Sequence, residues 1–332
     1  MSVVCPFYNE SAIICAAAEQ MAKRLESDFE DWELILVNDG STDDSLEVIR
    51  RYCDEHGLDR ISIISYMPNR GRGHALRQGI QTATRSIIVT TEVDLSWGDD
   101  IVARLFDALG ENENAHFAIA SPQLTRQGYH EVPLSRRLVS RWGNRLIGLF
   151  FRGGVTMHTG MTRAYHSDMI KPMEFRSNGK EFHLEVLLKL LALGFEPVEI
   201  PATISWSARN RAERPALRRS QIFNRRMLGT ISSHLLFVAL ARPMAYFGVI
   251  SAITVVAGSG FAAAAVWNLI TGGVSAFFTL IALILFLFGV LFMGFAVVFT
   301  QLREISRENW LDYYPDHTAV RTKVTRYGAE RK

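Results

Sequence analysis

The sequence has few cysteines and no large excess of either charge. Its three cysteines, Cys5, Cys15 and Cys53, match neither a CxxC motif nor a Cys/His metal site. We therefore expect reduced, partly buried thiols in a cytosolic compartment. The 36 basic and 34 acidic residues leave a formal net charge of +2. This balance excludes a strongly polyanion-binding surface, so no nucleic-acid partner is expected.

Charge is missing altogether from residues 243–302, a stretch of 60 residues rich in Phe, Leu, Ile, Val and Ala. About 20 helical residues cross the hydrocarbon core of a bilayer, and this stretch is interrupted at Asn268 and at residues 271–273. We predict two membrane-spanning helices, near residues 245–267 and 276–299. The alternative is a buried helical hairpin of a soluble protein, which other segments would have to cover on all sides.

Arginines flank both predicted spans, whereas the loop between the spans has no basic residue. Under the positive-inside rule, the large N-terminal domain and both termini should therefore be cytoplasmic. No signal peptide is expected, because an apolar run at residues 2–5 leads at once into Pro6. The predicted order is a cytosolic domain (1–215), a juxtamembrane basic helix (216–242), two transmembrane helices (243–302) and a cytosolic tail (303–332).

Apolar, β-rich runs alternate with helical patterns through the first 120 residues. This alternation predicts an α/β domain with a mainly parallel sheet, whose ligand crevice lies at the carboxyl ends of the strands. The predicted strands are 2–5, 33–37, 61–65, 87–91 and 117–120, and the predicted helices are 11–29, 45–56, 74–84 and 101–109. Farther along, we predict a helix at 180–193 and a strand at 197–201.

Polar clusters follow three of the predicted strands, at residues 6–10, 38–43 and 92–96. They should meet at one edge of the sheet. In the second cluster, Asp39 precedes a Gly-Ser-Thr turn, which suits a carboxylate that hydrogen-bonds a ribose or a base. The alternative is that this cluster merely caps the next helix, through Ser41, Thr42 or Asp43.

Glu92 and Asp94 lie one residue apart, so both carboxylates can face one side only if the backbone turns there. Mg²⁺ and Mn²⁺ prefer oxygen ligands from one or two carboxylates plus substrate phosphates, and either ion would offset charge on a diphosphate leaving group. A solvated acidic turn is the alternative. The position of the pair beside the predicted crevice favours a metal site.

Together these motifs resemble the family 2 glycosyltransferases of the GT-A fold. Within that family, the chain is most similar to the dolichyl-phosphate mannose synthase and polyprenyl-phosphate glycosyltransferase branch. The motifs are VCPFYNE (4–10), VNDGSTD (37–43), NRGRGHALRQG (69–79), EVDLS (92–96) and GFEPVEIP (194–201). With the two terminal spans, the resemblance extends over nearly the whole chain.

The resemblance implies roles for residues on the donor side. The residues expected to bind the nucleotide sugar are Pro6, Tyr8, Glu10, Asp39 and Arg72. Asp94 and Glu92 are expected to be catalytic and to hold Mg²⁺ or Mn²⁺ on the diphosphate. The chain departs from the family here, because the family usually has an aspartate where Glu92 stands.

The acceptor side departs further from the family pattern. Relatives commonly carry an Asp before a Ser-Gly-Phe-Arg-like run, whereas residues 157–163 contain no carboxylate. A phosphomonoester is largely dianionic near neutral pH, since its second pKa is about 6. Such an acceptor can attack without a protein base, so the reaction would need alignment and charge neutralisation instead.

Arginines are the expected ligands of the acceptor phosphate. Arg126, Arg136 and Arg137 lie in or beside a predicted interfacial amphipathic helix at about 135–151, and Arg126 is also expected to be catalytic. An ordinary core-facing helix with a solvated basic face is the alternative. Arg209 and Arg211 occupy the place of an Arg-rich acceptor loop in relatives, and could instead bind anionic lipid headgroups.

We therefore predict an inverting, metal-dependent transfer of one sugar from GDP-mannose or a UDP-sugar to a polyprenyl or dolichyl phosphate at the cytoplasmic membrane face. The alternatives are a processive polysaccharide synthase, for which two spans are few and the Gln-x-x-Arg-Trp signature is missing, and a non-catalytic sensor or scaffold. A transporter is excluded because neither span contains an ionisable residue. Membrane lipids are expected partners, and the sequence leaves a homo-oligomer open.

Overall fold

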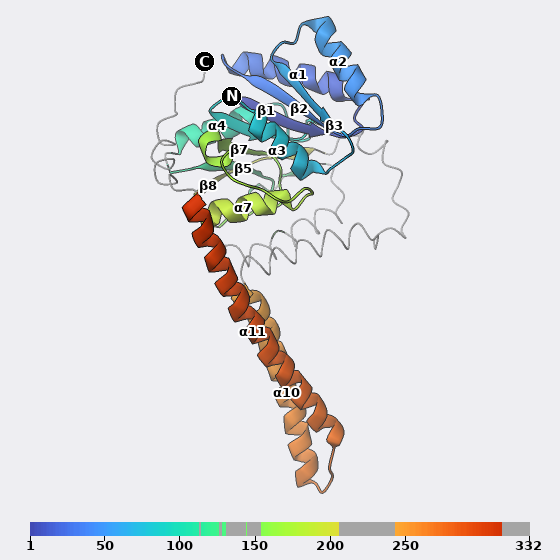
Figure 1. Cartoon of the computed structure of the whole chain (residues 1–332), viewed down its shortest axis with the longest axis vertical. Coiled ribbons are helices and arrows are strands. Elements are labelled where there is room, and N and C mark those ends of the chain that lie inside the picture. Colours follow the sequence, from blue (N-terminus) through green and yellow to red (C-terminus); the bar gives the residue numbers. More distant parts are fainter. Residues whose placement is uncertain (113, 126–127, 131–143, 145–153, 206–242, 314–332) are drawn as a thin grey trace. The chain divides into compact units, whose positions relative to one another are not determined.

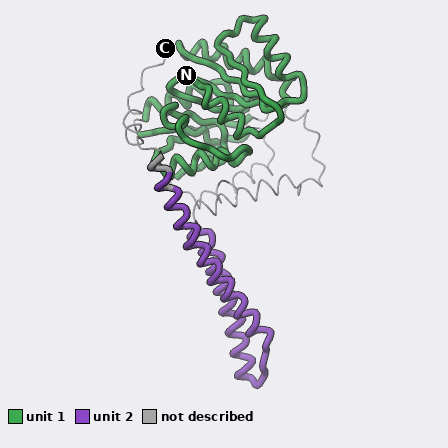
Figure 2. Tube along the Cα trace, in the orientation of Figure 1, with its two compact units in different colours: residues 1–230, 313–332 green, residues 231–312 purple. Residues whose placement is uncertain are grey.

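The computed structural model describes the chain except for residues 113, 126–127, 131–143, 145–153, 206–242 and 314–332. It divides into two compact units, one of residues 1–230 with 313–332 and the other of residues 231–312 (Figure 2). The juxtamembrane helix predicted at 216–242, most of the predicted tail and, apart from Asn144, the interfacial helix predicted at 135–151 lie outside the described residues.

A seven-stranded sheet forms the centre of the first unit (Figure 1). Its strand order is β3-β2-β1-β4-β7-β5-β8, and all neighbouring strands are parallel except that β7 runs antiparallel to β4 and β5. The strands are β1 (Ser2–Phe7), β2 (Glu33–Asp39), β3 (Ile61–Tyr66), β4 (Ile87–Thr90), β5 (Phe117–Ser121), β7 (Arg163–His166) and β8 (Pro197–Pro201). The mainly parallel sheet predicted from the sequence is confirmed.

The helices predicted between these strands are also present. They are α1 (Ile14–Asp28), α2 (Ser45–His56), α3 (Arg72–Thr82), α4 (Ile101–Glu111) and α7 (Phe182–Ala192), with a short α6 (Ser167–Ile170) after β7. Helix α3 begins two residues earlier than its predicted start at residue 74. The reason lies in the hydrogen bonds that hold residues 70 and 71, described below.

Two neighbouring valines of β1 show how the helices divide between the faces of the sheet, because successive strand residues point to opposite faces. A Cβ atom added to Gly79 would lie 2.3 Å from Val4 Cγ1, so α3 packs directly on the face of β1 that carries Val4. Val3 borders a cavity that is also lined by Met21 of α1 and Val102 of α4. Helices α1 and α4 therefore cover the other face.

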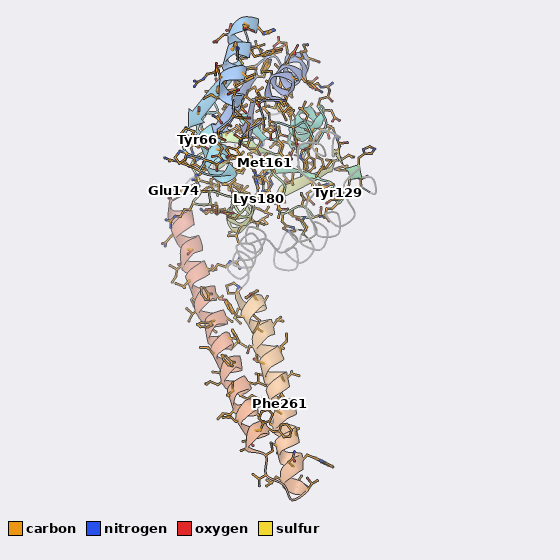
Figure 3. The ribbon with its side chains drawn as sticks, turned by 90° about the vertical axis from the view of Figure 1, so that its right-hand side faces the viewer. Tyr66, Tyr129, Met161, Glu174, Lys180 and Phe261 are labelled. Carbon is orange, nitrogen blue, oxygen red and sulfur yellow. The ribbon has the colours of Figure 1, made fainter. Side chains whose placement is uncertain are left out.

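Strand β7 is the strand of the central sheet that the sequence pattern did not predict. It contains Arg163 and His166, so it does not read as an apolar run, yet all four of its residues are buried. A small second sheet pairs β6 (Tyr129–His130) with β9 (Ile204–Ser205) in parallel, and Tyr129 is labelled in Figure 3. The main-chain N–H of Ser205 donates to the main-chain oxygen of Ser96 at 2.8 Å, which joins this sheet to the loop after β4.

The second unit contains α10 (Pro243–Ile270) and α11 (Ala276–Tyr313). Both helices are long and apolar enough to cross a membrane. Ser251 Oγ donates to the main-chain oxygen of Gly289 at 2.7 Å. Rings also meet across the hairpin, since the centroids of Phe261, labelled in Figure 3, and Phe278 lie 6.1 Å apart. The break that the sequence predicted lies between Ile270 and Ala276.

The close contact at Gly289 gives a test of this hairpin. A Cβ atom at Gly289 would lie 2.6 Å from Val255 Cγ2, so Gly289→Val should destabilise the hairpin by about 1–3 kcal/mol through overpacking. Gly294→Val is the matched control, because a Cβ atom there meets no atom within 4 Å. Thermal unfolding in detergent should show a lower midpoint for Gly289→Val alone, and equal midpoints for the two variants would contradict the described packing.

Candidate active site

The three predicted polar clusters do meet at one edge of the sheet. Strand β1 lies between β2 and β4 and runs parallel to both, with Phe7 opposite Asn38 and Val4 opposite Thr90. The carboxyl ends of the three strands therefore point the same way, and the loops that follow them border a common crevice. The convergence expected from the sequence is confirmed.

Asp39, at the end of β2, uses its carboxylate to hold the start of α3. Its Oδ1 accepts from Tyr66 Oη at 2.9 Å and from the main-chain N–H groups of Arg70 at 2.9 Å and Gly71 at 3.1 Å, and its Oδ2 accepts from Gly71 N at 3.0 Å. The side chain is buried, with 5% of the residue exposed. Charge-assisted bonds of this kind are strong, so Asp39 fixes the turn that leads to Arg72.

Two neighbours of Asp39 reinforce this turn. Burial and the hydrogen bond to Asp39 raise the pKa of Tyr66 far above its usual value, so the phenol remains a donor. Gly40 has a φ of +66°, and a Cβ atom there would lie 2.4 Å from Asn69 N. Glycine alone permits this close approach. The capping alternative holds in part, because Asp43 Oδ1 accepts from the main-chain N–H of Ser45, the first residue of α2, at 3.1 Å.

The first polar cluster is bound to the second by hydrogen bonds. Asn9 takes a φ of +57°, accepts from Thr42 N at 2.8 Å and donates its own N–H to Ser41 Oγ at 3.0 Å. Glu10 N donates to Ser45 Oγ at 2.8 Å. The loops after β1 and β2 therefore form one rigid rim.

The predicted donor-side residues take different places on this rim. Pro6 is buried within β1, Glu10 is half-buried, and Tyr8 is 44% exposed. Arg72 is the first residue of α3. Tyr8 and Arg72 are therefore the two of these side chains best placed to contact a ligand from the rim.

The loop after β4 brings its two carboxylates together. Glu92 Oε1 accepts from Arg72 Nη1 at 3.2 Å, while Oε2 accepts from Ser96 Oγ at 3.2 Å and Trp97 Nε1 at 3.3 Å. Asp94 Oδ1 accepts from Ser96 N at 3.0 Å. Both carboxylates thus bind Ser96, and the backbone turns directly after Asp94, where Leu95 has a φ of +52°.

This donor set fits a divalent cation that also binds a substrate. Among the described residues, no group of three or more His, Cys, Asp or Glu side chains could hold a metal ion. Two neighbouring carboxylates are nevertheless sufficient for Mg²⁺ or Mn²⁺ when phosphate oxygens complete the coordination. Glu92 and Asp94 would hold the ion in that way.

The far side of the α3 N-terminus is held by the segment before α7. The main-chain oxygen of Asn178 accepts from Gly73 N at 2.7 Å. Glu185 in turn accepts from the N–H groups of Arg176 at 3.0 Å and Ser177 at 2.8 Å, and from Lys189 Nζ at 2.8 Å. Burial raises the pKa of Glu185, but the hydrogen bonds from Lys189, Ser177 and Arg176 outweigh it and leave a net lowering.

The segment that corresponds to the family's acceptor run is bound on several sides. Glu199 of β8 accepts from the N–H groups of Thr156 and Met157, both at 2.8 Å. Arg163, which is fully buried, donates to the main-chain oxygens of His158 at 2.7 Å and His183 at 2.9 Å. Glu199 and Arg163 therefore hold this segment in place through hydrogen bonds to its main chain.

This segment is also joined to the carboxylate loop. Thr90 Oγ1 donates to the main-chain oxygen of Met161, labelled in Figure 3, at 2.6 Å. The hydroxyls of Thr91 and Thr162 lie 3.2 Å apart. Residues 161–162 thus contact the two residues that immediately precede Glu92.

Arg163, Glu185 and Glu199 were not among the residues that the sequence suggested. Glu199 lies in the GFEPVEIP motif, but nothing in that motif shows that its carboxylate reaches residues 156 and 157. The predicted acceptor-side residues Arg126, Arg136, Arg137, Arg209 and Arg211 lie outside the described part of the chain.

Glu199 offers a direct test of the acceptor-side segment. Glu199→Gln should lower the free energy of unfolding by about 1.5–3 kcal/mol, because the new amide group can accept only one of the two N–H groups. Glu196→Gln, an exposed change three residues away on the same segment, should have little effect. Thermal unfolding in detergent checks this. Unchanged stability of Glu199→Gln would contradict a stabilising role for its two hydrogen bonds.

Buried histidines should make the stability of the first unit depend on pH. Burial lowers the pKa of both His158 and His166 from an ordinary value of 6.5 to about 4. The charge of Arg163 adds to this effect at His158, and the charge of His116 adds to it at His166. The folded chain then binds fewer protons than the unfolded chain between about pH 4 and 6.5, so its stability falls as the pH falls through that range.

The variant that tests this is His166→Gln. It should remove on the order of 2 kcal/mol of the stability loss between pH 7 and pH 5, measured as unfolding midpoints at both values. The exposed His130 provides the control, since His130→Gln should leave the pH dependence unchanged. An equal slope in both variants would show that His166 is not a source of the effect.

Comparison with known proteins shows the family of the chain. The family model described as glycosyl transferase family 2 matches residues 2–173. An uncharacterized glycosyltransferase of Bacillus subtilis (strain 168), YkcC, is 30% identical over 120 residues, which are 36% of this chain and 36% of that protein. The human dolichyl-phosphate beta-glucosyltransferase is 34% identical over 99 residues, 28% of this chain and 31% of that protein. The chain spans about a third of the length of these curated relatives.

A solved structure shows the same fold. It is glucosyl-3-phosphoglycerate synthase from Mycobacterium tuberculosis in complex with Mn²⁺, uridine-diphosphate-glucose and phosphoglyceric acid. Its TM-score is 0.52 at 19% identity, covering 72% of this chain and 79% of that chain. The GT-A-like architecture expected from the motifs is therefore confirmed. With more than half of its length matched by the family model, the chain belongs to glycosyl transferase family 2.

Proposed function

We propose that this enzyme transfers one sugar, with inversion, from a nucleotide sugar to a polyprenyl or dolichyl phosphate at the cytoplasmic membrane face. One observation carries the proposal. The carboxylate pair of Glu92 and Asp94 lies beside Arg72 at the ligand edge of the sheet, in a chain that also has two helices able to cross a membrane. The first feature suits a diphosphate donor, and the second suits an acceptor that resides in the bilayer.

On the donor side, the rim formed by the loops after β1 and β2 holds the nucleoside, with Pro6, Tyr8, Glu10 and Asp39 lining the pocket. Arg72 binds the diphosphate. Glu92 and Asp94 hold Mg²⁺ or Mn²⁺, which when bound neutralises charge that develops on the departing diphosphate. A structural neighbour whose complex contains Mn²⁺ and a uridine-diphosphate sugar supports this assignment.

On the acceptor side, the proposal assigns the phosphate to the arginines at 126, 136, 137, 209 and 211. The relation to a dolichyl-phosphate glucosyltransferase supports the lipid phosphate as acceptor.

The reaction is a single displacement. An oxygen of the acceptor phosphate attacks the anomeric carbon of the sugar while the bond from that carbon to the diphosphate oxygen breaks, so the nucleoside diphosphate leaves and the configuration inverts. The acceptor is largely dianionic near neutral pH and needs no protein base. Arg72 and the acceptor-side arginines neutralise the two phosphate groups, and the rigid rim aligns them.

A radiolabel assay tests the proposal. Detergent-solubilised enzyme is incubated with polyprenyl phosphate, Mn²⁺ or Mg²⁺ and a panel of labelled nucleotide sugars, and the lipid phase is extracted. We expect label in the lipid from one donor, lost with EDTA and reduced at least about 100-fold by Asp94→Asn. Asp99→Asn, an exposed change in the same loop, should retain most activity. Donor binding without lipid label from any sugar would contradict the proposed acceptor.

A further inference from the structure

The ion pair between Arg72 and Glu92 joins the group proposed to bind the diphosphate with a group proposed to bind the metal. Their side chains are 30% and 35% exposed, respectively, so both remain within reach of solvent and of a ligand. Among the described residues, Arg72 and Glu92 form an ion pair with each other and with no other residue. Each residue is therefore the main counter-charge of the other.

The backbone on both sides of Arg72 is fixed. Gly71 N donates to both oxygens of Asp39, at 3.1 and 3.0 Å, and Gly73 N donates to the oxygen of Asn178 at 2.7 Å. Arg72 can therefore change its partner by a rotation of its side chain, without movement of α3. Its Nε atom is buried and has no hydrogen-bond partner among the described residues.

The surroundings of Arg72 favour an anion. His183, at the start of α7, is buried, and its pKa is lowered well below the ordinary value first by that burial and then by Arg72 and Arg163. Arg72 and Arg163 thus both act on one neutral histidine, and Glu92 is the carboxylate that pairs with Arg72. A guanidinium in such a place gains from a second anionic partner, because uncompensated positive charge is costly where solvent is limited.

Opposite charges enter this site together during the proposed reaction. A divalent cation needs the Glu92 carboxylate, and a diphosphate needs the Arg72 guanidinium. While the two side chains neutralise each other, each ligand alone must compete with the ion pair. When both ligands bind, Glu92 exchanges Arg72 for the metal cation, and Arg72 exchanges Glu92 for the anionic diphosphate.

We propose that the Arg72–Glu92 ion pair is an exchangeable lock that couples binding of the metal ion to binding of the nucleoside diphosphate. This inference rests on the donor-side assignment of the proposed function and is independent of the acceptor. Coupling of this kind is reciprocal, so the factor by which metal strengthens diphosphate binding equals the factor by which diphosphate strengthens metal binding. The pair is partly exposed, so its contribution to each affinity should be about fivefold.

Two single variants should each gain affinity for one ligand. Arg72→Met releases Glu92, so the variant should bind Mn²⁺ alone about fivefold more tightly than the parent enzyme. Glu92→Gln releases Arg72, so this variant should bind UDP or GDP in EDTA about fivefold more tightly. A variant that merely failed to fold would lose affinity, which makes both gains diagnostic.

The measurement is a pair of titrations on the full chain in detergent. Free Mn²⁺ is followed by its electron paramagnetic resonance signal, and UDP and GDP binding by calorimetry, with Asp94→Asn defining Mn²⁺ bound elsewhere. The coupling factor between Mn²⁺ and the tighter nucleotide should shrink in Arg72→Met. Arg85→Met is the matched control, because it breaks an ion pair of 2.8 Å between Arg85, which precedes β4, and Asp31, which precedes β2, at the opposite ends of these strands. It should change none of these affinities.

Several outcomes would overturn the lock. These are no gain of Mn²⁺ affinity in Arg72→Met, no gain of nucleotide affinity in Glu92→Gln, an unchanged coupling factor, or no binding of either nucleotide to the parent enzyme. The readout is binding, so it is distinguishable from a failure of the proposed function. An enzyme that labels no lipid could still show both gains, and one that labels lipid could show neither.

Discussion

The carboxylate of Asp39 controls the geometry around the start of α3, because it binds main-chain groups that lie 31 and 32 residues later in the sequence. It is buried, so leaving its oxygens without donors would be unfavourable by several kcal/mol. The folded chain satisfies them with Tyr66 and with the N–H groups of residues 70 and 71. The start of α3 is thereby placed beside β2, and Arg72 follows directly.

The same principle operates in the segments before α7 and before β7, with other residues. Glu199 and Glu185 accept main-chain N–H groups, and Arg163 donates to main-chain oxygens. A charged group inside the protein gains most when its hydrogen-bond capacity is filled by fixed dipoles. Loops that have no regular hydrogen-bonding pattern of their own are made rigid in this way.

Sequence patterns predicted most of the sheet, because strands covered on both faces are continuous apolar runs, such as ELILV in β2. They missed β7, because Arg163 and His166 interrupt the apolar pattern and are buried only through contacts with distant segments. They also placed Asp39 near a ligand without revealing its bonds to residues 70 and 71. Periodicity reports which face of an element is buried, whereas a side chain's partners depend on tertiary contacts.

The difference from the usual family motif at Glu92 has a physical interpretation in these contacts. The carboxylate reaches Arg72 on α3 at 3.2 Å and also accepts from Ser96 and Trp97 in its own loop. An aspartate would withdraw the carboxylate by about 1.5 Å, the length of one carbon–carbon bond. From the same backbone position it could not keep partners on both sides, since hydrogen bonds weaken steeply beyond about 3.5 Å.

The extra methylene group therefore allows one side chain to join α3 to the loop after β4, while Asp94 stays close through Ser96. The two acidic residues differ in what they bind, although they are one residue apart. Glu92 is neutralised by a cation of the protein itself, whereas Asp94 Oδ1 accepts a main-chain N–H in its own loop. A site built in this way holds its carboxylates together, because Arg72 offsets part of the repulsion between them.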